Sequence, residues 1–269
     1  MTPVASALRH RLRSVAARAG LQPERLWHGL ATRAYRRKLA RDVDFREWWS
    51  REGQRIVEGH WGHEELHGEF KQLHLASQLY ELTGMLRRRV GTVGDARVLD
   101  AAASDGFFLS RLGVKRGVGV NILLACARKI RSDGSQACLA DLERLPFADQ
   151  AFDYVVSCET LEHVRSPLAA LDELIRVAAR RIFLTIPWML RTRITHRPHG
   201  WPNVESHIFE FSEADFSKVL SYARVKIVYQ SRVQVFPEPV NPLTQWWLGT
   251  LMYPNYFPKL QYYELEPIR

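Results

Sequence analysis

Residues 96–110 constrain the fold of this chain more than any other stretch, and they read Ala-Arg-Val-Leu-Asp-Ala-Ala-Ala-Ser-Asp-Gly-Phe-Phe-Leu-Ser. A short apolar strand ends in Asp100, small residues continue to Gly106, and an amphipathic segment follows. Small residues let the backbone approach a ligand closely, and a helix start offers free N–H groups to a carboxylate or phosphate. The stretch therefore predicts a strand, a tight turn and a helix that form a nucleotide-type binding corner.

The glycine pattern of this corner is incomplete, so a second interpretation stays open. Ala102 and Ser104 stand where glycines are expected, and only Gly106 remains. A buried strand before an ordinary helix start would give the same pattern.

Two further strands favour the binding corner. Residues 118–121 predict a strand about 20 residues on, and it ends in Asn121, where a ribose-binding group belongs. Residues 137–142 predict a third strand that ends near Asp141. Strands that alternate with helices at this spacing predict a parallel sheet.

The alternation continues beyond the third strand. Ser166, a cap residue followed by proline, predicts a helix start. The apolar stripe of this helix is Leu168, Leu171, Leu174, Ile175 and Ala178. Residues 181–187 predict a fifth strand, and Ser212 opens another helix with a capping-box pattern.

Residues 145–164 carry the run Leu-Pro-Phe-Ala-Asp-Gln-Ala-Phe-Asp-Tyr-Val-Val-Ser-Cys-Glu-Thr-Leu-Glu-His-Val. Read in order, the segments between about residues 95 and 235 resemble the class I S-adenosylmethionine-dependent methyltransferases, and among them the small-molecule, type 11-like enzymes. The resemblance is most specific from Asp141 to His163. It implies an α/β fold with a Rossmann-like, doubly wound, seven-stranded and mainly parallel sheet.

The resemblance also implies S-adenosylmethionine as the cofactor. Asp100 would approach its amino-acid end, Asp141 would accept from the adenine amino group, and the Leu142 N–H would meet a ring nitrogen. For Asp141, a strand-end turn carboxylate is the alternative. Asn121 replaces the usual carboxylate, which predicts weakened ribose binding. The implied cofactor-binding residues are Asp100, Ala102, Ser104, Gly106, Asn121, Asp141, Leu142 and Cys158.

A second polar group follows the fourth strand, at the edge where ligands of open α/β sheets bind. If a helix begins there, Glu159, Glu162 and His163 lie on one face, and His207 supplies another imidazole. Three interpretations stay open. His163 can be a general base with Glu159 as its orienter. The four residues can bind a divalent metal, as in the small-RNA 3′-end methyltransferases and certain quinone O-methyltransferases. They can also be structural.

The sequence therefore predicts methyl transfer to an oxygen of a small metabolite, with carbon or nitrogen as the second choice. An RNA methyltransferase with a divalent metal site is one alternative, and a non-catalytic binding protein of the same fold is another.

Charge is concentrated at the N-terminus. Residues 1–45 contain ten basic and three acidic residues, which accounts for +7 of the net charge of +9. Such an arm is typical of peripheral membrane or other acidic-surface contact, and residues 1–40 also resemble an organellar transit peptide. A solvated basic helix is the plain alternative. The nearly neutral remainder disfavours a catalytic face built for nucleic acid.

Cysteine usage and hydropathy predict a cytoplasmic protein. Cys126, Cys138 and Cys158 have no metal-ligand spacing, which is typical of reduced, buried thiols. The sequence has no apolar run of the roughly 20 residues that a membrane span needs.

We expect three regions. Residues 1–90 form a basic helical extension, residues 91–237 the methyltransferase domain, and residues 238–269 an aromatic-rich tail that packs on or near it. Residues 225–229 and 233–236 would supply the antiparallel pair that the resemblance places at one sheet edge.

An insertion at residues 188–203 combines basic and aromatic side chains, which are Trp188, Arg191, Arg193, His196, Arg197, His199 and Trp201. It suits a substrate with an acidic group and a flat or apolar body. A mobile surface loop is the alternative.

Overall fold

The computed structural model describes residues 23–57, 68–91, 93–189, 191–194, 207–236 and 259–269. The chain divides into two compact units. The first comprises Met1–Val57, Leu66–Tyr80 and Val235–Pro258, and the second comprises Glu58–Glu65, Glu81–Gln234 and Lys259–Arg269.

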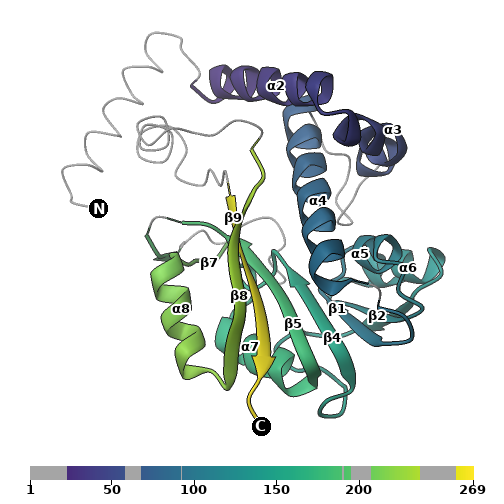
Figure 1. The fold of residues 1–269 in the computed structure, drawn as a ribbon, viewed down its shortest axis with the longest axis vertical. Helices are drawn as coiled ribbons and strands as arrows, with labels where there is room; N and C mark the ends of the chain where they lie inside the picture. The colour runs from purple at the N-terminus through teal and green to yellow at the C-terminus, as the bar shows by residue number, and fades with distance from the viewer. Residues whose placement is uncertain (1–22, 58–67, 92, 190, 195–206, 237–258) are drawn as a thin grey trace. The chain divides into compact units, whose positions relative to one another are not determined.

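The second unit is built on a seven-stranded sheet with the order β3-β2-β1-β4-β5-β9-β8 (Figure 1). Its strands are β1 Arg97–Ala101, β2 Arg116–Asn121, β3 Gln136–Leu139, β4 Phe152–Cys158, β5 Ala178–Pro187, β8 Val225–Gln234 and β9 Lys259–Pro267. Neighbouring strands from β3 to β5 are parallel, whereas β9 runs antiparallel to β5 and β8. The predicted Rossmann-like sheet of seven mainly parallel strands is confirmed.

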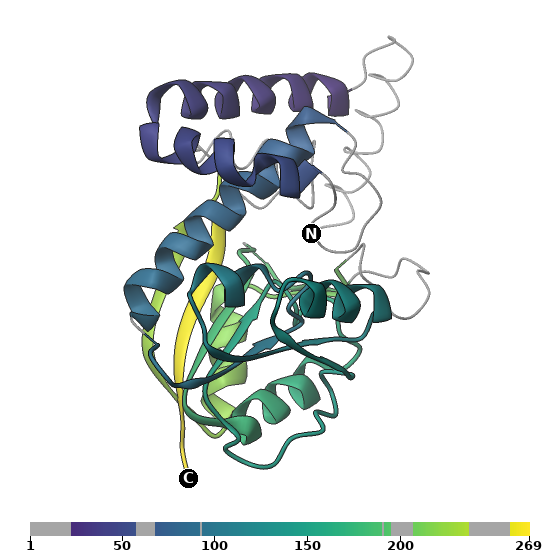
Figure 2. The ribbon, with the colours of Figure 1, turned by 90° about the vertical axis from the view of Figure 1, so that its right-hand side faces the viewer.

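Helices lie on both faces of this sheet (Figures 1 and 2). On one face, α5 Phe107–Arg111 and α6 Leu124–Ser132 approach closely, because a Cβ on Gly119 would lie only 3.0 Å from Ile130 of α6. On the opposite face, Leu99 and Val155 share a buried core with α7 Pro167–Val177 and α8 Glu213–Tyr222. Both faces are therefore covered, as a parallel sheet requires.

The predicted helix starts are confirmed in α7 and α8. Ser166 caps α7 by accepting a hydrogen bond from the Ala169 N–H at 3.4 Å, and Ser212 caps α8 by accepting from the Asp215 N–H at 3.2 Å. The apolar stripe predicted for α7 is wrong at its two ends. Leu168 is 58% exposed, and Ala178 begins β5.

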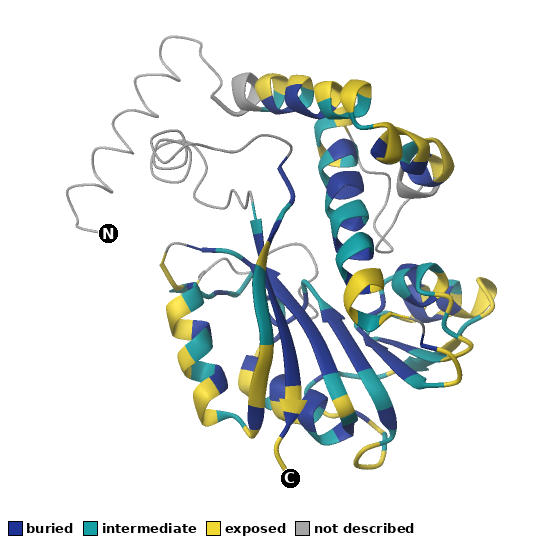
Figure 3. Cartoon of the chain, in the orientation of Figure 1, coloured by how far each residue is buried: buried dark blue, intermediate teal, exposed yellow. Residues whose placement is uncertain are grey.

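The predicted antiparallel pair of residues 225–229 and 233–236 is wrong. Most of these residues belong to one strand, β8. Its pairing with β9 has a register irregularity between Ile227 and Tyr229, and the strand continues beyond it. Its partner is β9, from the segment assigned to a tail, and β9 lies between β5 and β8 (Figure 1). Most of β9 is buried (Figure 3), so these aromatic and apolar residues are a central part of the sheet.

The first unit is helical where it is described. It contains α2 Pro23–Arg41, α3 Val43–Val57 and the first half of α4 Glu69–Val90. The Tyr35 hydroxyl lies 2.6 Å from His74 Nδ1, and burial lowers the pKa of His74 to about 4. None of the described helices is long and apolar enough to cross a membrane. The basic residues before Pro23 lie outside the described residues.

Candidate functional site

The loop after β1 adopts the backbone of a glycine-rich turn, although only one of its three key residues is glycine. The φ angle is 66° at Ala102, 50° at Ser104 and 80° at Gly106. A side chain in this left-handed region costs roughly 1–2 kcal/mol per residue, because Cβ crowds the following carbonyl oxygen. The two residues that replace glycine therefore hold strained backbone, which is a recurring feature of ligand-binding loops.

Two buried carboxylates accompany this turn. Asp100 is 2% exposed, and its Oδ2 has no hydrogen-bond partner. Burial, reinforced by the charge of Asp105, raises the pKa of Asp100 to about 8. Asp105 Oδ1 accepts a hydrogen bond from the Phe107 N–H at the start of α5. Asp100 thus retains acceptor capacity that a cationic group could use.

The polar residues after β2 and β3 lie at the same sheet edge and are held by local hydrogen bonds. Asn121 Oδ1 accepts from the Leu123 N–H at 2.9 Å, and Asp141 Oδ1 accepts from the Glu143 N–H at 3.0 Å. The third strand ends at Leu139, earlier than predicted, so Asp141 lies in the loop beyond it. The side chain of Asp141 is 30% exposed, whereas the neighbouring Leu142 is buried.

No helix begins at Glu159, so the condition for placing Glu159, Glu162 and His163 on one helical face is not met. Glu159 directly follows β4 and has a left-handed φ of 52°, and the next helix begins only at Pro167. The backbone N–H of Glu159 instead donates to Thr185 O at 3.1 Å, across to the end of β5. A turn between β4 and α7, defined here as residues 159–165, therefore presents these side chains.

This turn still brings three of the four predicted residues together. Ligand atoms of Glu162, His163 and His207 lie within 4.8 Å of one another. Two backbone bonds join the segments, since the N–H groups of Ile208 and Phe209 both donate to Glu162 O, at 2.7 and 3.1 Å. We call Glu162, His163 and His207 the polar cluster.

Burial dominates the electrostatics of the polar cluster. The side chain of Glu162 is 1% exposed, and neither of its carboxylate oxygens has a hydrogen-bond partner. Burial and the charge of Glu159 raise the pKa of Glu162 well above its usual range, and burial raises that of Glu159 to about 8. His163 and His207 are 17% and 20% exposed, so an incoming molecule can reach the imidazoles.

Cys158 ends β4 beside these groups. Burial raises the pKa of its thiol well above the usual range, with a further contribution from the charge of Asp100. The thiol is therefore neutral at physiological pH and serves as a packing or weak hydrogen-bonding group.

Sequence reasoning missed Glu210, which is fully buried beside the polar cluster. His207 Nδ1 lies 3.4 Å from Glu210 Oε1, and Arg193 Nε lies 3.1 Å from Glu210 Oε2. The pairing depends on a short hairpin of β6 Arg193–Ile194 and β7 Phe209–Glu210. The spacing of His207 and Glu210, three residues apart, was the available signal.

Part of the predicted insertion, residues 188–203, can be placed. Arg193 is paired with Glu210, and Trp188 Nε1 donates to Glu213 Oε2 at 3.3 Å. Arg191 is exposed. The remaining candidate substrate groups, His196, Arg197, His199 and Trp201, lie outside the described residues.

The polar cluster has the donor set of a divalent-cation site. One carboxylate and two imidazoles suit ions such as Zn²⁺ or Mn²⁺, and a bound ion would be coordinated by the unpartnered oxygens of Glu162. Glu159, the fourth predicted ligand, does not belong to this group of atoms. The same arrangement also fits an imidazole base oriented by a buried carboxyl group.

The sheet order with its single inserted antiparallel strand, and the strained loop after β1, define a class I S-adenosylmethionine-dependent methyltransferase fold. Residues 99–183 match the family model described as a methyltransferase domain. Over these residues the chain is similar in sequence to a methyltransferase domain, in agreement with the fold.

Solved structures share the fold at low sequence identity. The 4+2 cyclase SpnF is 16% identical, with a TM-score of 0.55 over 82% of this chain and 93% of that one. Magnesium protoporphyrin IX methyltransferase from Synechocystis PCC 6803, with bound S-adenosylmethionine, is 15% identical, with a TM-score of 0.51 over 84% and 96%. The 1,6-didemethyltoxoflavin-N1-methyltransferase from Burkholderia thailandensis is 16% identical, with a TM-score of 0.50 over 71% and 78%. No curated protein sequence matches the chain.

Proposed function

We propose that this protein transfers the methyl group of S-adenosylmethionine to an oxygen of a small metabolite. The observation that carries the proposal is the polar cluster, which places two accessible imidazoles and a buried carboxyl group just beyond β4. In this fold the cofactor binds over the ends of β1 and β2, so a substrate beside the cluster would lie next to the methyl group.

The loops after the first three strands hold the cofactor in this proposal. Asp100, whose buried Oδ2 has no hydrogen-bond partner, accepts from the ammonium group of the cofactor, whose charge offsets the cost of burial. The strained turn of Ala102, Ser104 and Gly106, with its small side chains, lets the backbone approach the amino-acid end of the cofactor closely. Asn121 contacts the ribose, and Asp141 and Leu142 contact the adenine.

The cofactor supplies an electrophilic methyl group on a sulfonium. His163 would take the proton of the acceptor hydroxyl on an imidazole nitrogen, which frees an oxygen lone pair to accept the methyl group that the cofactor would supply. Glu162 Oε1 lies 4.0 Å from His163 Nε2, so this buried carboxyl group replaces Glu159 as the proposed neighbour of the imidazole. Most of the rate enhancement comes from holding oxygen and methyl in line.

The proposed substrate class rests on the described part of the insertion at residues 188–203. Trp188 and the exposed Arg191 favour a flat molecule with an acidic group. Two of the structural neighbours are named as methyltransferases of magnesium protoporphyrin IX and 1,6-didemethyltoxoflavin, which are ring compounds. Hydroxylated aromatic acids are therefore the first acceptors to test.

A calorimetric titration with S-adenosylhomocysteine tests cofactor binding, for which we expect a Kd of roughly 1–50 µM. Turnover is then measured as release of S-adenosylhomocysteine over a panel of hydroxylated aromatic acids, with amine and carbon acceptors as controls. Binding without turnover on any acceptor would favour a non-catalytic protein or, as for SpnF, another reaction on the same fold.

The second candidate is a metal-dependent methyltransferase, including one that acts on RNA. The donor set of Glu162, His163 and His207 favours it. In that case the cation would hold substrate hydroxyls, and His163 would be a ligand and not a base. Sensitivity of turnover to a chelator separates the two candidates.

The basic arm of residues 1–45 is proposed to contact an acidic surface such as an anionic membrane. Deleting residues 1–22 removes only part of this charge but spares α2, in which Tyr35 is fully buried. We expect unchanged S-adenosylhomocysteine affinity and weaker, less salt-sensitive binding to vesicles that contain an anionic lipid. Unchanged vesicle binding would place the contact elsewhere.

A further inference from the structure

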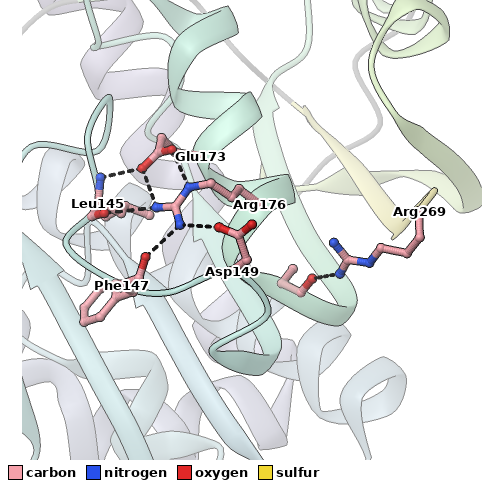
Figure 4. Close-up of polar contacts among 7 residues, drawn as sticks. Leu145, Phe147, Asp149, Glu173, Arg176 and Arg269 are labelled. Atoms are coloured by element: carbon pink, nitrogen blue, oxygen red, sulfur yellow. Dashed lines mark hydrogen bonds and ion pairs between the residues drawn. The ribbon is translucent and has the colours of Figure 1, made fainter.

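Arg176 of α7 contacts residues 145–149, the segment that follows Asp141 and Leu142 (Figure 4). Arg176 Nη1 donates to Phe147 O at 2.7 Å and to Asp149 Oδ1 at 2.9 Å. Its Nη2 donates to Leu145 O at 3.0 Å. Its Nε and Nη2 also donate to the two oxygens of Glu173, at 2.7 and 2.8 Å. All the nitrogens of the guanidinium are thus engaged.

Further bonds tie the same two segments together. Glu173 Oε2 accepts from the Leu145 N–H at 2.7 Å, and the Gln150 N–H donates to Arg176 O at 2.9 Å. At the other end of the loop, Glu143 Oε1 accepts from the Ser166 N–H at 2.9 Å. The chain from residue 143 to residue 150 is therefore fastened to α7 and its cap.

The arrangement is more than a surface ion pair. Arg176 and Glu173 are partly shielded, at 30% and 19% exposed, although Asp149 is 72% exposed, and two of the acceptors are backbone carbonyls. A planar fork of donors can satisfy two carbonyls and two carboxylates together, which the single ammonium of lysine cannot. Glu173 and Asp149 raise the pKa of Arg176 further, so the clamp stays charged at every physiological pH.

Segment 143–150 begins two residues after Asp141 and has no regular strand or helix of its own. Asp141 and Leu142 can keep a fixed position only if the chain that leaves them is fixed. A misplacement of about 1 Å in a binding group can cost up to 100-fold in activity, so rigidity here has functional value.

We propose that Arg176 is a positioning residue for the cofactor: by clamping residues 145–149 to α7, it holds Asp141 and Leu142 against the adenine. This inference rests on the proposed function, because it needs a cofactor at that edge. Arg176 itself touches no cofactor and acts only through the loop.

The test compares Arg176→Ala, Arg176→Lys and the matched control Arg181→Ala. Arg181 is also 30% exposed and also pairs with two carboxylates, but these are Glu264 and Glu266 of β9. Titration with S-adenosylhomocysteine at a temperature where circular dichroism shows each variant folded is expected to give a Kd raised about tenfold for Arg176→Ala. Arg176→Lys should fall between this variant and the wild type, and Arg181→Ala should stay within about twofold of the wild type.

Hydrogen exchange supplies a readout without ligand. In the free protein, Arg176→Ala should speed exchange of the amides in segment 143–150 more than Arg181→Ala does, while strands β1 and β4 keep their protection. Lower thermal stability in Arg176→Ala with a wild-type Kd would overturn the positioning role and leave a structural one. A wild-type chain that binds no S-adenosylhomocysteine would overturn the proposed function and this role together.

Discussion

The loops after β2 and β3 and the polar cluster after β4 lie at one edge of the sheet, yet their polar groups are held in opposite ways. Asn121 and Asp141 each accept a hydrogen bond from a backbone N–H two residues on. Both carboxylate oxygens of Glu162, in contrast, are buried without a hydrogen-bond partner. The loops after β2 and β3 therefore satisfy these side-chain oxygens by local hydrogen bonds, whereas the polar cluster has unused acceptor capacity.

This difference predicts which of the two regions a bound group stabilises more. A buried, unsatisfied acceptor costs about 1–3 kcal/mol, and more when it is charged. A proton, a cation or a substrate hydroxyl at Glu162 would remove that cost, whereas a ligand at Asp141 adds a contact to a group that is already stable. The loops after β2 and β3 therefore resemble a preformed site, and the polar cluster resembles one that its ligand completes.

The largest expected effect concerns what completes the polar cluster. If His163 is the base, His163→Ala should lower turnover on the best acceptor by roughly 10²–10⁴-fold and leave the Kd for S-adenosylhomocysteine unchanged. A chelator should then have no effect on the wild type. If a metal completes the cluster, a chelator should abolish turnover and Mg²⁺ or Mn²⁺ should restore it.

Turnover that survives both the chelator and His163→Ala would leave neither role standing. Catalysis would then depend on positioning alone, and the contrast between the two regions would lose its functional meaning.

The next effect tests the preformed side. Asp141→Ala removes a charged acceptor worth about 1.5–3 kcal/mol and should raise the Kd for S-adenosylhomocysteine by roughly 10–100-fold. Asn121→Asp should lower the Kd, because a carboxylate accepts from both ribose hydroxyls. Tighter binding by Asp141→Ala, or weaker binding by Asn121→Asp, would show that these loops do not hold the adenosine as proposed.

The pH dependence of stability sharpens the comparison further. The pKa of Glu159 is about 8 in the folded protein because of burial, whereas the ordinary value of 4.5 applies to the unfolded chain. Between these two values the folded state keeps a proton that the unfolded state has released. Stability should therefore fall as pH rises from about 4.5 to 8, by up to about 1.4 kcal/mol per pH unit for this group.

Urea unfolding of the ligand-free protein at pH 5, 6.5 and 8 measures this slope. Glu159→Gln should make the slope shallower, whereas Glu266→Gln, which changes a carboxylate that is 48% exposed, should leave it unchanged. Asp100, whose burial raises its pKa to about 8, contributes a slope of the same sign that remains in both variants. Equal slopes in wild type and Glu159→Gln would contradict the assignment.

The loops after β2 and β3 were easier to predict from the sequence than the polar cluster, because their hydrogen bonds join residues that are close in the sequence. Asn121 and Asp141 follow strands that the sequence marks by local apolar runs, and their hydrogen bonds span two residues. The cluster depends on distant partners. Glu210 is placed by pairing with Arg193, and β9 pairs Tyr262 with Thr185 across the whole C-terminal part of the chain. No local pattern encodes such pairings, and the spacing of Glu159, Glu162 and His163 imitated a helix where the structure has a turn.

The smallest expected effect concerns the strained loop after β1, which precedes the two preformed loops. Ala102, with a φ of 66°, should tolerate Ala102→Gly, which removes roughly 1–2 kcal/mol of strain but adds about 0.4–1 kcal/mol of entropy to the unfolded chain. We expect a net gain of between about 0 and about 1.6 kcal/mol in urea unfolding. Ala127→Gly in α6, where glycine has no advantage, should instead lose about 1 kcal/mol. Because the glycine also removes the Cβ nearest the expected cofactor, its Kd for S-adenosylhomocysteine should fall or stay equal. A loss of stability in Ala102→Gly as large as that in Ala127→Gly would show that the loop is not strained, and that the replacement of glycine at this position costs the fold nothing.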